Sequence, residues 1–137
     1  RTTALMRLLL DTHALLWFLT EPKKLPHKTL RLIERPETAV WFSAVSLWEL
    51  SLKFSLGKLR LKNLSPEDIA HEAKEQNFDL LTLSETDALG FRNVPRHLHH
   101  DPFDRMLIWQ AIQRDLTLVS AETGLNEYRQ LGLRWRW

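Results

Sequence analysis

Short apolar runs alternate with segments of helical period along the whole chain. The run MRLLL at residues 6–10 ends in polar residues, which predicts a buried strand. Apolar and β-branched runs at 38–43, 78–83 and 116–120 predict three more strands, and the alternating LRWRW at 133–137 predicts an edge strand. Helices are predicted between the strands, at residues 14–19, 26–35, 44–58, 65–76, 84–91, 101–115 and 121–131.

Helix-start signals support this division. Ser65 followed by Pro66 and two acidic residues is typical of an N-cap and a first turn, and Ser84 and Asp87 have the spacing of a capping box. Strands that alternate with helices predict a parallel sheet with helices on both faces, an α/β fold.

Composition limits the class of protein. The 137 residues are 44% hydrophobic and 26% charged, which fits one globular domain, expected at residues 6–137. Residues 1–5 precede Met6 and are expected to be a vector-derived leader rather than a signal peptide. The lack of cysteine excludes disulfides and thiolate metal sites and agrees with a cytoplasmic location. The net charge is only +2, so nucleic-acid contacts would depend on local basic patches.

Acidic residues fall where the strands end or where the following helices begin. Asp11 directly follows the first strand, Glu122 follows the strand at 116–120, and Glu49 lies in the helix after 38–43. Asp101 and Asp104 begin the helix that leads into 116–120. In open α/β sheets ligands bind beyond the carboxyl ends of the strands, so these carboxylates are expected to converge at one edge. Clustered carboxylates require a cation, and oxygen ligands favour Mg²⁺ or Mn²⁺, which can activate water for attack on a phosphodiester.

Each acid also has a purely structural interpretation. Asp11 and Asp101 can cap the helices that follow them, and Asp104 can be a first-turn acid stabilised by the helix dipole. Glu49 can be a solvent-exposed helix residue. Glu122 can be an acid in the first turn of a helix whose N-cap is Ser120. From the residues alone both interpretations stay open, but only convergence explains why every acid falls at the same edge.

The order of these motifs resembles a known family. The segments LLLDTHALLW, FSAVSLWELSLK, HHDPFDRMLIWQA and LTLVSAETGLNEY resemble the four acidic motifs of PIN-domain ribonucleases, above all the VapC-type toxins of bacterial toxin–antitoxin pairs. The resemblance covers residues 6–137. It implies an α/β/α sandwich on a mostly parallel sheet of four or five strands, Mg²⁺- or Mn²⁺-dependent endoribonuclease activity, a homodimer, and neutralisation by a VapB-like antitoxin.

The resemblance also assigns roles to the acids. Asp11, Glu49 and Asp104 match the first three family acids, expected to hold the metal, while Thr12 and Ser43 match polar positions beside it; Asp101 is an additional acid, assigned chiefly to capping. The fourth family position is usually aspartate, and here it is Glu122, one methylene longer. We expect Asp11, Glu49, Asp104 and Glu122 to be the catalytic and metal-binding residues.

Two other functions are alternatives to the nuclease. A metal-dependent phosphatase of the haloacid dehalogenase type needs a second acid two residues after the first aspartate, but His13 stands there. A catalytically weak PIN module that mainly binds its antitoxin and acts as a co-repressor is the remaining alternative, and the departure at Glu122 favours it.

The remaining features concern nucleic-acid and protein contacts. Three histidines, His97, His99 and His100, are interpreted as a loop lining the groove rather than a transition-metal site. Candidate contacts to the RNA backbone, with ordinary solvated surface as the alternative, are Lys53, Lys58, Arg60, Arg96 and Arg105.

The aromatic and apolar segments concern packing and protein contacts. Trp17, Trp41, Trp48 and Trp109 are expected in the core or a dimer interface. The terminal Trp135 and Trp137 are expected to share one face, with base stacking as a less favoured role. The apolar segments LLWFL and LWELSLKFSL are expected to bind a partner helix or a second copy.

Overall fold

The computed structural model describes residues 6–96 and 100–137, so the expected leader and two of the loop histidines, His97 and His99, lie outside the described residues. Within the described residues, five strands form one parallel sheet in the order β3-β2-β1-β4-β5. This confirms the predicted parallel sheet. The strands are β1 (Met6–Leu10), β2 (Thr38–Ser43), β3 (Asp79–Leu81), β4 (Thr117–Val119) and β5 (Arg134–Arg136).

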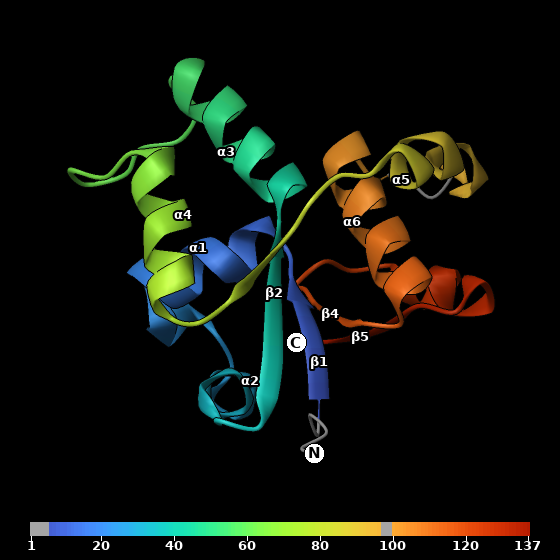
Figure 1. The fold of residues 1–137 in the computed structure, drawn as a ribbon, viewed down its shortest axis with the longest axis horizontal. Helices are drawn as coiled ribbons and strands as arrows, with labels where there is room; N and C mark the ends of the chain where they lie inside the picture. Colours follow the sequence, from blue (N-terminus) through green and yellow to red (C-terminus); the bar gives the residue numbers. More distant parts are fainter. Residues whose placement is uncertain (1–5, 97–99) are drawn as a thin grey trace.

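Helices cover both faces of the sheet, as Figure 1 shows: α1, α2 and α4 lie on one side, and α5 and α6 lie on the other. The α-helices are α1 (Thr12–Thr20), α2 (His27–Glu34), α3 (Ala44–Ser55), α4 (Pro66–Glu75), α5 (Glu85–Gly90) and α6 (Pro102–Arg114). Short 3₁₀ segments are η1 (Pro22–Lys24), η2 (Phe91–Asn93) and η4 (Leu125–Leu131). None of the helices in the described residues is long and apolar enough to cross a membrane.

Two hydrophobic cores lie on opposite faces of the sheet. Side chains alternate along β1, so that Leu8 and Leu10 pack with α1, α2 and α4, while Leu9 packs with α6 and η4. All three leucines are fully buried. Burial on both faces explains why the sequence of β1 is an unbroken apolar run. The carboxyl end of β1 lies at the centre of the sheet, between β2 and β4.

The predicted helix starts are confirmed by hydrogen bonds. Ser65 and Asp68 form a reciprocal capping box at α4, and Ser84 and Asp87 form another at α5. The Asp101 carboxylate accepts the backbone N–H of Asp104 at 2.8 Å, so Asp101 caps α6 as expected.

One predicted helix is wrong. The segment 121–131 contains only the 3₁₀ segment η4, which starts at Leu125 after Gly124 adopts a φ of +81°. The Ser120 hydroxyl does accept the backbone N–H of Glu122, at 3.1 Å, but no helix begins there. Glu122 therefore lies in the loop after β4 and is not a first-turn acid. The positive φ at Gly124, a conformation that other residues rarely adopt, separates this loop from η4.

The tryptophans only partly follow the prediction. Trp41 and Trp109 are partly buried against the core on the α6 side, and Trp17 is partly buried against Trp137. Trp48, in contrast, is 58% exposed on the outer face of α3. Trp135 packs into the core with α6, whereas Trp137 packs with α1 on the other side, so the expectation that they share one face is wrong. The prediction of an edge strand at the C-terminal end is confirmed by β5.

The apolar pattern of α1 is used inside the molecule. Leu15 and Leu16 are buried, and Phe18 and Leu19 pack against the same core, so most of the apolar pattern of α1 is used within the chain; binding of a partner by this segment stays a prediction.

On α3 the pattern does leave an exposed apolar surface, made by Trp48 and Leu52 one turn apart, and it continues to Leu56 just after the helix. We call these three residues the α3 face; Phe54 is also exposed but lies on the opposite side of the helix.

Candidate metal and nuclease site

The carboxyl end of β1 carries the first acid of the site. Asp11 is 5% exposed, and its carboxylate accepts the backbone N–H of Ala14 at 2.8 Å, so it caps α1. Burial raises the pKa of Asp11, against hydrogen bonds from Ser120 and Ala14 that act in the opposite direction. The carboxylate is thus both a helix cap and a buried group at the sheet edge.

Asp104 lies in the first turn of α6, one turn from the Asp101 cap. Burial first, and then the negative charges of Asp101, Glu122, Glu49 and Asp11, raise the pKa of Asp104 to about 8. This shift means that four other acids, from the ends of β1 and β4 and from α3 and α6, all act on one carboxyl group. The predicted convergence of the acids at one edge of the sheet is therefore present in the structure.

Glu49 projects from α3 into the same region. It is 2% exposed, so its interpretation as a solvated helix residue is wrong. Its Oε2 pairs with the Lys53 ammonium one turn later, while its Oε1 is buried and has no hydrogen-bond partner. A buried carboxylate oxygen without a donor is costly even when the other oxygen is paired, because its lone pairs are neither solvated nor hydrogen-bonded.

Glu122 and a histidine complete the cluster. Ligand atoms of His100, Asp104 and Glu122 all lie within 4.8 Å of one another, so the longer glutamate reaches the centre despite its departure from the usual aspartate. His100 packs its ring at 5.5 Å from that of Tyr128. His100 lines the cavity with the acids, in agreement with a histidine loop at the groove. The sequence interpretation sets metal binding by these histidines aside, and it misses that the His100 imidazole lies within ligand distance of Asp104 and Glu122.

These groups line one small cavity. Its polar wall is formed by Asp11, His100, Asp104, Ser120 and Glu122. Its floor is apolar and is formed by Leu107, Ile108, Leu118 and Leu125. An apolar floor beneath several carboxylates keeps water from screening their mutual repulsion, which strengthens the requirement for a cation.

The two secondary residues, Thr12 and Ser43, use their hydroxyls within the protein. The Thr12 hydroxyl donates to Ser46 Oγ at 3.0 Å. The Ser43 hydroxyl caps α3 by accepting the Val45 N–H at 3.0 Å, and it donates to Gln110 Oε1 at 2.6 Å. Both therefore join elements that carry the acids.

A buried polar network holds α6 in place, and no local pattern along the chain indicates it. Gln110 donates to the Asp87 carboxylate at 3.0 Å, and Arg114 grips the same carboxylate through two nitrogens at 2.8 and 2.9 Å. With the bond from Ser43 to Gln110, this network connects the start of α3 to α5 and α6. It holds the helices of Glu49 and Asp104 against each other.

Two of the basic residues expected near RNA are engaged elsewhere. The Lys53 ammonium is held by Glu49, and its pKa is raised chiefly by that hydrogen bond. The Arg105 guanidinium lies 4.7 Å from the ring centre of Phe91. Lys58, Arg60 and Arg96 have no salt bridge within the described residues, so their role in RNA contact stays a prediction.

Comparison with known proteins agrees with this geometry. The model of the PIN domain family matches residues 8–131, nearly the whole chain. The chain belongs to the PIN domain family. PIN domains are generally metal-dependent nucleases, and the carboxylate cluster found here is of the kind that such chemistry needs. Among curated proteins none matches the sequence.

Several solved structures share this PIN fold. VapBC2 from Rickettsia felis, bound to a DNA fragment from its promoter, superposes with a TM-score of 0.67 at 16% identity, over 96% of this chain and 99% of that one. DNA-bound VapBC from Salmonella typhimurium superposes with a TM-score of 0.63 at 20% identity, over 96% of this chain and 98% of that one. VapBC-1 from nontypeable Haemophilus influenzae superposes with a TM-score of 0.61 at 16% identity, over 96% of this chain and 97% of that one. At these identities the similarity establishes the fold.

The residues present fit a divalent cation. The unpaired Oε1 of Glu49 and the raised pKa of Asp104 both indicate a local excess of negative charge that Lys53 alone does not offset. Carboxylate oxygens suit Mg²⁺ and Mn²⁺, and the nearby imidazole of His100 adds a nitrogen ligand that suits transition metals.

Proposed function

We propose that this PIN domain is a Mg²⁺- or Mn²⁺-dependent endoribonuclease and the toxin of a toxin–antitoxin pair. The observation that carries the proposal is that Asp11, Asp104, Glu122 and His100 line one cavity, with ligand atoms of the last three within 4.8 Å of one another. Burial, and then the negative charges of Asp101, Glu122, Glu49 and Asp11, raise the pKa of Asp104 to about 8. Like charges on four separate segments destabilise the fold, and a cation bound among them would remove that cost.

Asp11, Glu49 and Asp104 would hold the cation, with Glu122 and His100 in support. When bound, the cation would supply activation of water and stabilisation of the charge that develops on the phosphodiester. The chain itself contributes by holding these carboxylates in position. Asp11 is fixed by its bond to the backbone of Ala14, and Asp104 is fixed by the cap of α6.

Cleavage of a mixed RNA pool tests the nuclease. We expect cleavage with Mg²⁺ or Mn²⁺ and none with EDTA. Asp104→Asn and Glu49→Gln should each lose more than the ~10- to 100-fold that follows from removing groups that merely orient metal ligands. Asp101→Asn is the matched control, because asparagine keeps the helix cap and should retain most activity. Unchanged cleavage by Asp104→Asn, or cleavage in EDTA, would refute the assignment.

Metal binding can be measured without RNA. Mn²⁺ should raise the Tm of the wild type and leave that of Glu49→Gln nearly unchanged, since glutamine removes the negative charge and replaces one carboxylate oxygen with an NH₂ group that cannot bind a cation. A stabilisation of about 2.7 kcal/mol is expected at a metal concentration 100 times the Kd. An equal shift in both proteins would place the metal elsewhere.

The proposed partner is a VapB-like antitoxin. The similar structures from Rickettsia felis and Salmonella typhimurium are VapBC assemblies, and the α3 face offers exposed apolar side chains. Trp48 is 58% exposed and packs edge-on against Phe103, at 4.9 Å between ring centres, beside the acidic cavity. An apolar helix laid on this face would cover the approach to Glu49. A homodimer through the same face is a second expectation, tested by the molar mass in solution.

Expression in bacteria tests the toxin assignment. The wild type should arrest growth, Asp104→Asn should not, and a cognate antitoxin should restore growth to cells that make the wild type. Trp48→Glu should keep the arrest but escape the antitoxin, because a charge would be buried in the contact. Arrest by Asp104→Asn would show that toxicity does not depend on the acidic site.

A further inference from the structure

A second hollow adjoins the acidic cavity on the side of α1. It is lined by Asp11 and Glu122, which it shares with that cavity, and also by His13, Trp17 and Thr123. His13 is exposed, and its ring centre lies 5.4 Å from that of Trp17. Aromatic surface therefore begins directly beside the carboxylates.

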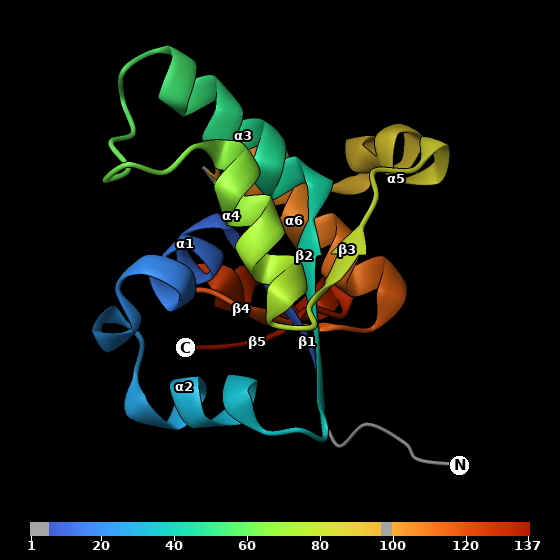
Figure 2. The same ribbon diagram turned by 60° about the vertical axis from the view of Figure 1, so that its left-hand side comes forward.

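The aromatic surface continues away from the acids. Trp17 packs against Trp137, with ring centres 5.7 Å apart, and the Lys24 ammonium lies 5.4 Å from the ring centre of Trp17. In the view of Figure 2 the C-terminal end of the chain lies between α1 and α2. Rings accompanied by cations are typical of surfaces that bind single-stranded nucleic acid.

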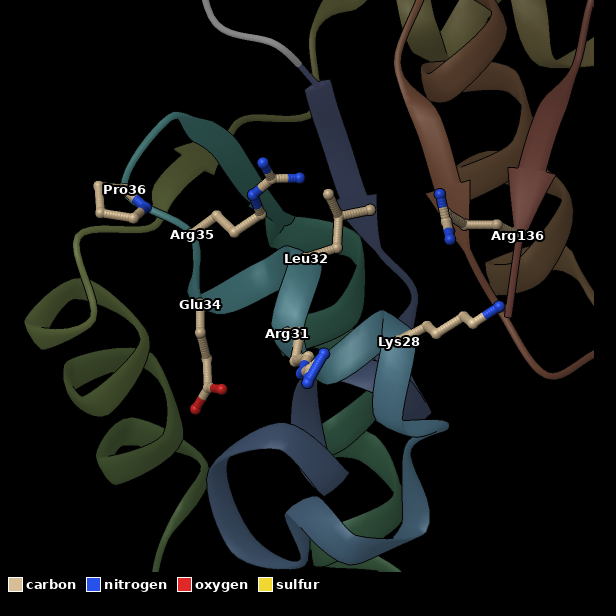
Figure 3. Close-up of a pocket in the computed structure, with 7 residues that line it drawn as sticks. All are labelled: Lys28, Arg31, Leu32, Glu34, Arg35, Pro36 and Arg136. Carbon is tan, nitrogen blue, oxygen red and sulfur yellow. The ribbon is translucent and has the colours of Figure 1, made fainter.

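A basic pocket is lined by Arg136, the residue that precedes Trp137 in the chain. It has a volume of about 660 Å³ and is formed by α2 and β5, where Lys28, Arg31, Arg35 and Arg136 line it. Figure 3 shows Lys28 extending toward β5 and Arg136 pointing toward α2, while the carboxylate of Glu34 points away from Arg136. The pocket therefore carries an excess of positive charge.

The cations of this pocket are not neutralised from within. Over residues 6–96 and 100–137, none of the four has a carboxylate partner within 4.0 Å. The Nε of Arg136 is buried and has no hydrogen-bond partner. Unpaired guanidinium and ammonium groups in a hollow are suited to phosphate oxygens.

From these observations we infer that single-stranded RNA runs from the acidic cavity along a track formed by His13, Trp17, Lys24, Lys28, Arg136 and Trp137. The inference rests on the proposed nuclease function, since the track begins at its carboxylates. Unpaired bases stack on the rings and phosphates contact the cations. With a net charge of only +2 and several acids at the site, the chain has no general positive field, so a local track must hold the strand.

RNA binding without cleavage tests the track. All proteins carry Asp104→Asn, and the probe is a fluorescent, unstructured RNA of about 16 nucleotides, followed by anisotropy between about 50 and 200 mM salt. The test protein adds Lys24→Gln and Lys28→Gln, and the matched control adds Lys62→Gln and Lys74→Gln. All four lysines are exposed, so folding is not at risk.

The slope of log affinity against log salt should become shallower by about 1.4 in the test protein, or 0.7 for each lost phosphate contact, and stay unchanged in the control. Trp17→Leu should weaken binding about fivefold or more by removing a stacking ring while keeping apolar bulk. Its matched control is Trp41→Leu, which removes a partly buried tryptophan on β2. Equal losses in test and control proteins, or duplex RNA bound as tightly as single strands, would overturn the inference.

Failure of the track and failure of the nuclease give different results. If the wild type cleaves RNA and the track variants bind it normally, the track is wrong and the nuclease stands. If the wild type does not cleave but binding falls in the track variants alone, the nuclease is wrong and the track stands.

Discussion

Replacing Asp87 by asparagine would test how firmly α5 and α6 are joined beneath the site. The Asp87 carboxylate is 2% exposed and accepts two hydrogen bonds from Arg114 and one from Gln110. It also completes the capping box of α5 with Ser84. Asparagine removes the charge and places an NH₂ group where donors already converge, so at least one buried donor loses its partner.

The expected cost follows from these contacts. Removing one partner of a buried ion pair costs about 3–5 kcal/mol, because the other charge is left uncompensated. The Arg114 side chain is 27% exposed, so water can solvate part of its guanidinium in the variant, which favours the lower end. We expect Asp87→Asn to lower the free energy of unfolding by about 3 kcal/mol, or the Tm by about 10 °C.

The pH dependence of this cost has a definite sign. Burial raises the pKa of Asp87, but the hydrogen bonds from Arg114 and Gln110 outweigh it, so the pKa lies below its usual range. A depressed pKa in the folded state contributes stability above the pKa of the unfolded chain, and this stability is lost as pH falls through the folded value. The difference between wild type and variant should be full at pH 7 and shrink below about pH 4.

Thermal and urea unfolding at neutral and acidic pH would measure both effects. The free energy of unfolding of the variant is compared with that of the wild type at each pH, so that the contribution of the other titrating acids, which both proteins share, cancels. Glu85→Gln is the control, because Glu85 is an exposed residue of the same helix, and its change should stay within about 0.5 kcal/mol. A variant as stable as this control at pH 7, or a difference that does not shrink in acid, would refute the reasoning.

Two further stability predictions concern packing near the site. Gly90→Ala should destabilise the protein by about 1–3 kcal/mol in urea unfolding, because a Cβ there would lie 2.7 Å from the Trp109 side chain; a neutral result would mean that Trp109 moves freely. Tyr128→Phe should change stability by less than about 1 kcal/mol, because the buried hydroxyl has no hydrogen-bond partner; a larger loss in thermal unfolding would reveal a partner for it.

The strand and helix order and the position of the acids could be predicted from the sequence because both depend on local pattern. Asp11 ends an apolar run, and Asp101 precedes a proline at a helix start. A parallel sheet gathers the ends of its strands at one edge, so local positions sufficed to predict that the acids converge.

The remaining features depend on which side chains meet, and no local pattern records that. Gln110 looks like an ordinary polar helix residue, yet it is fully buried because Ser43 and Asp87 come from segments far away in the sequence. Trp48 looks like a core residue, but α3 turns it outward. The loop after β4 has the residues of a helix, but Gly124 with its positive φ interrupts it.

The sheet order has a consequence for synthesis of the protein. β1 lies at the centre and pairs with β2, but also with β4, which is more than a hundred residues later in the chain. The acidic cavity likewise combines Asp11 with Glu122. A nascent chain therefore lacks a complete site until the segment through Glu122 has emerged from the ribosome, since β4 must pair before these carboxylates meet.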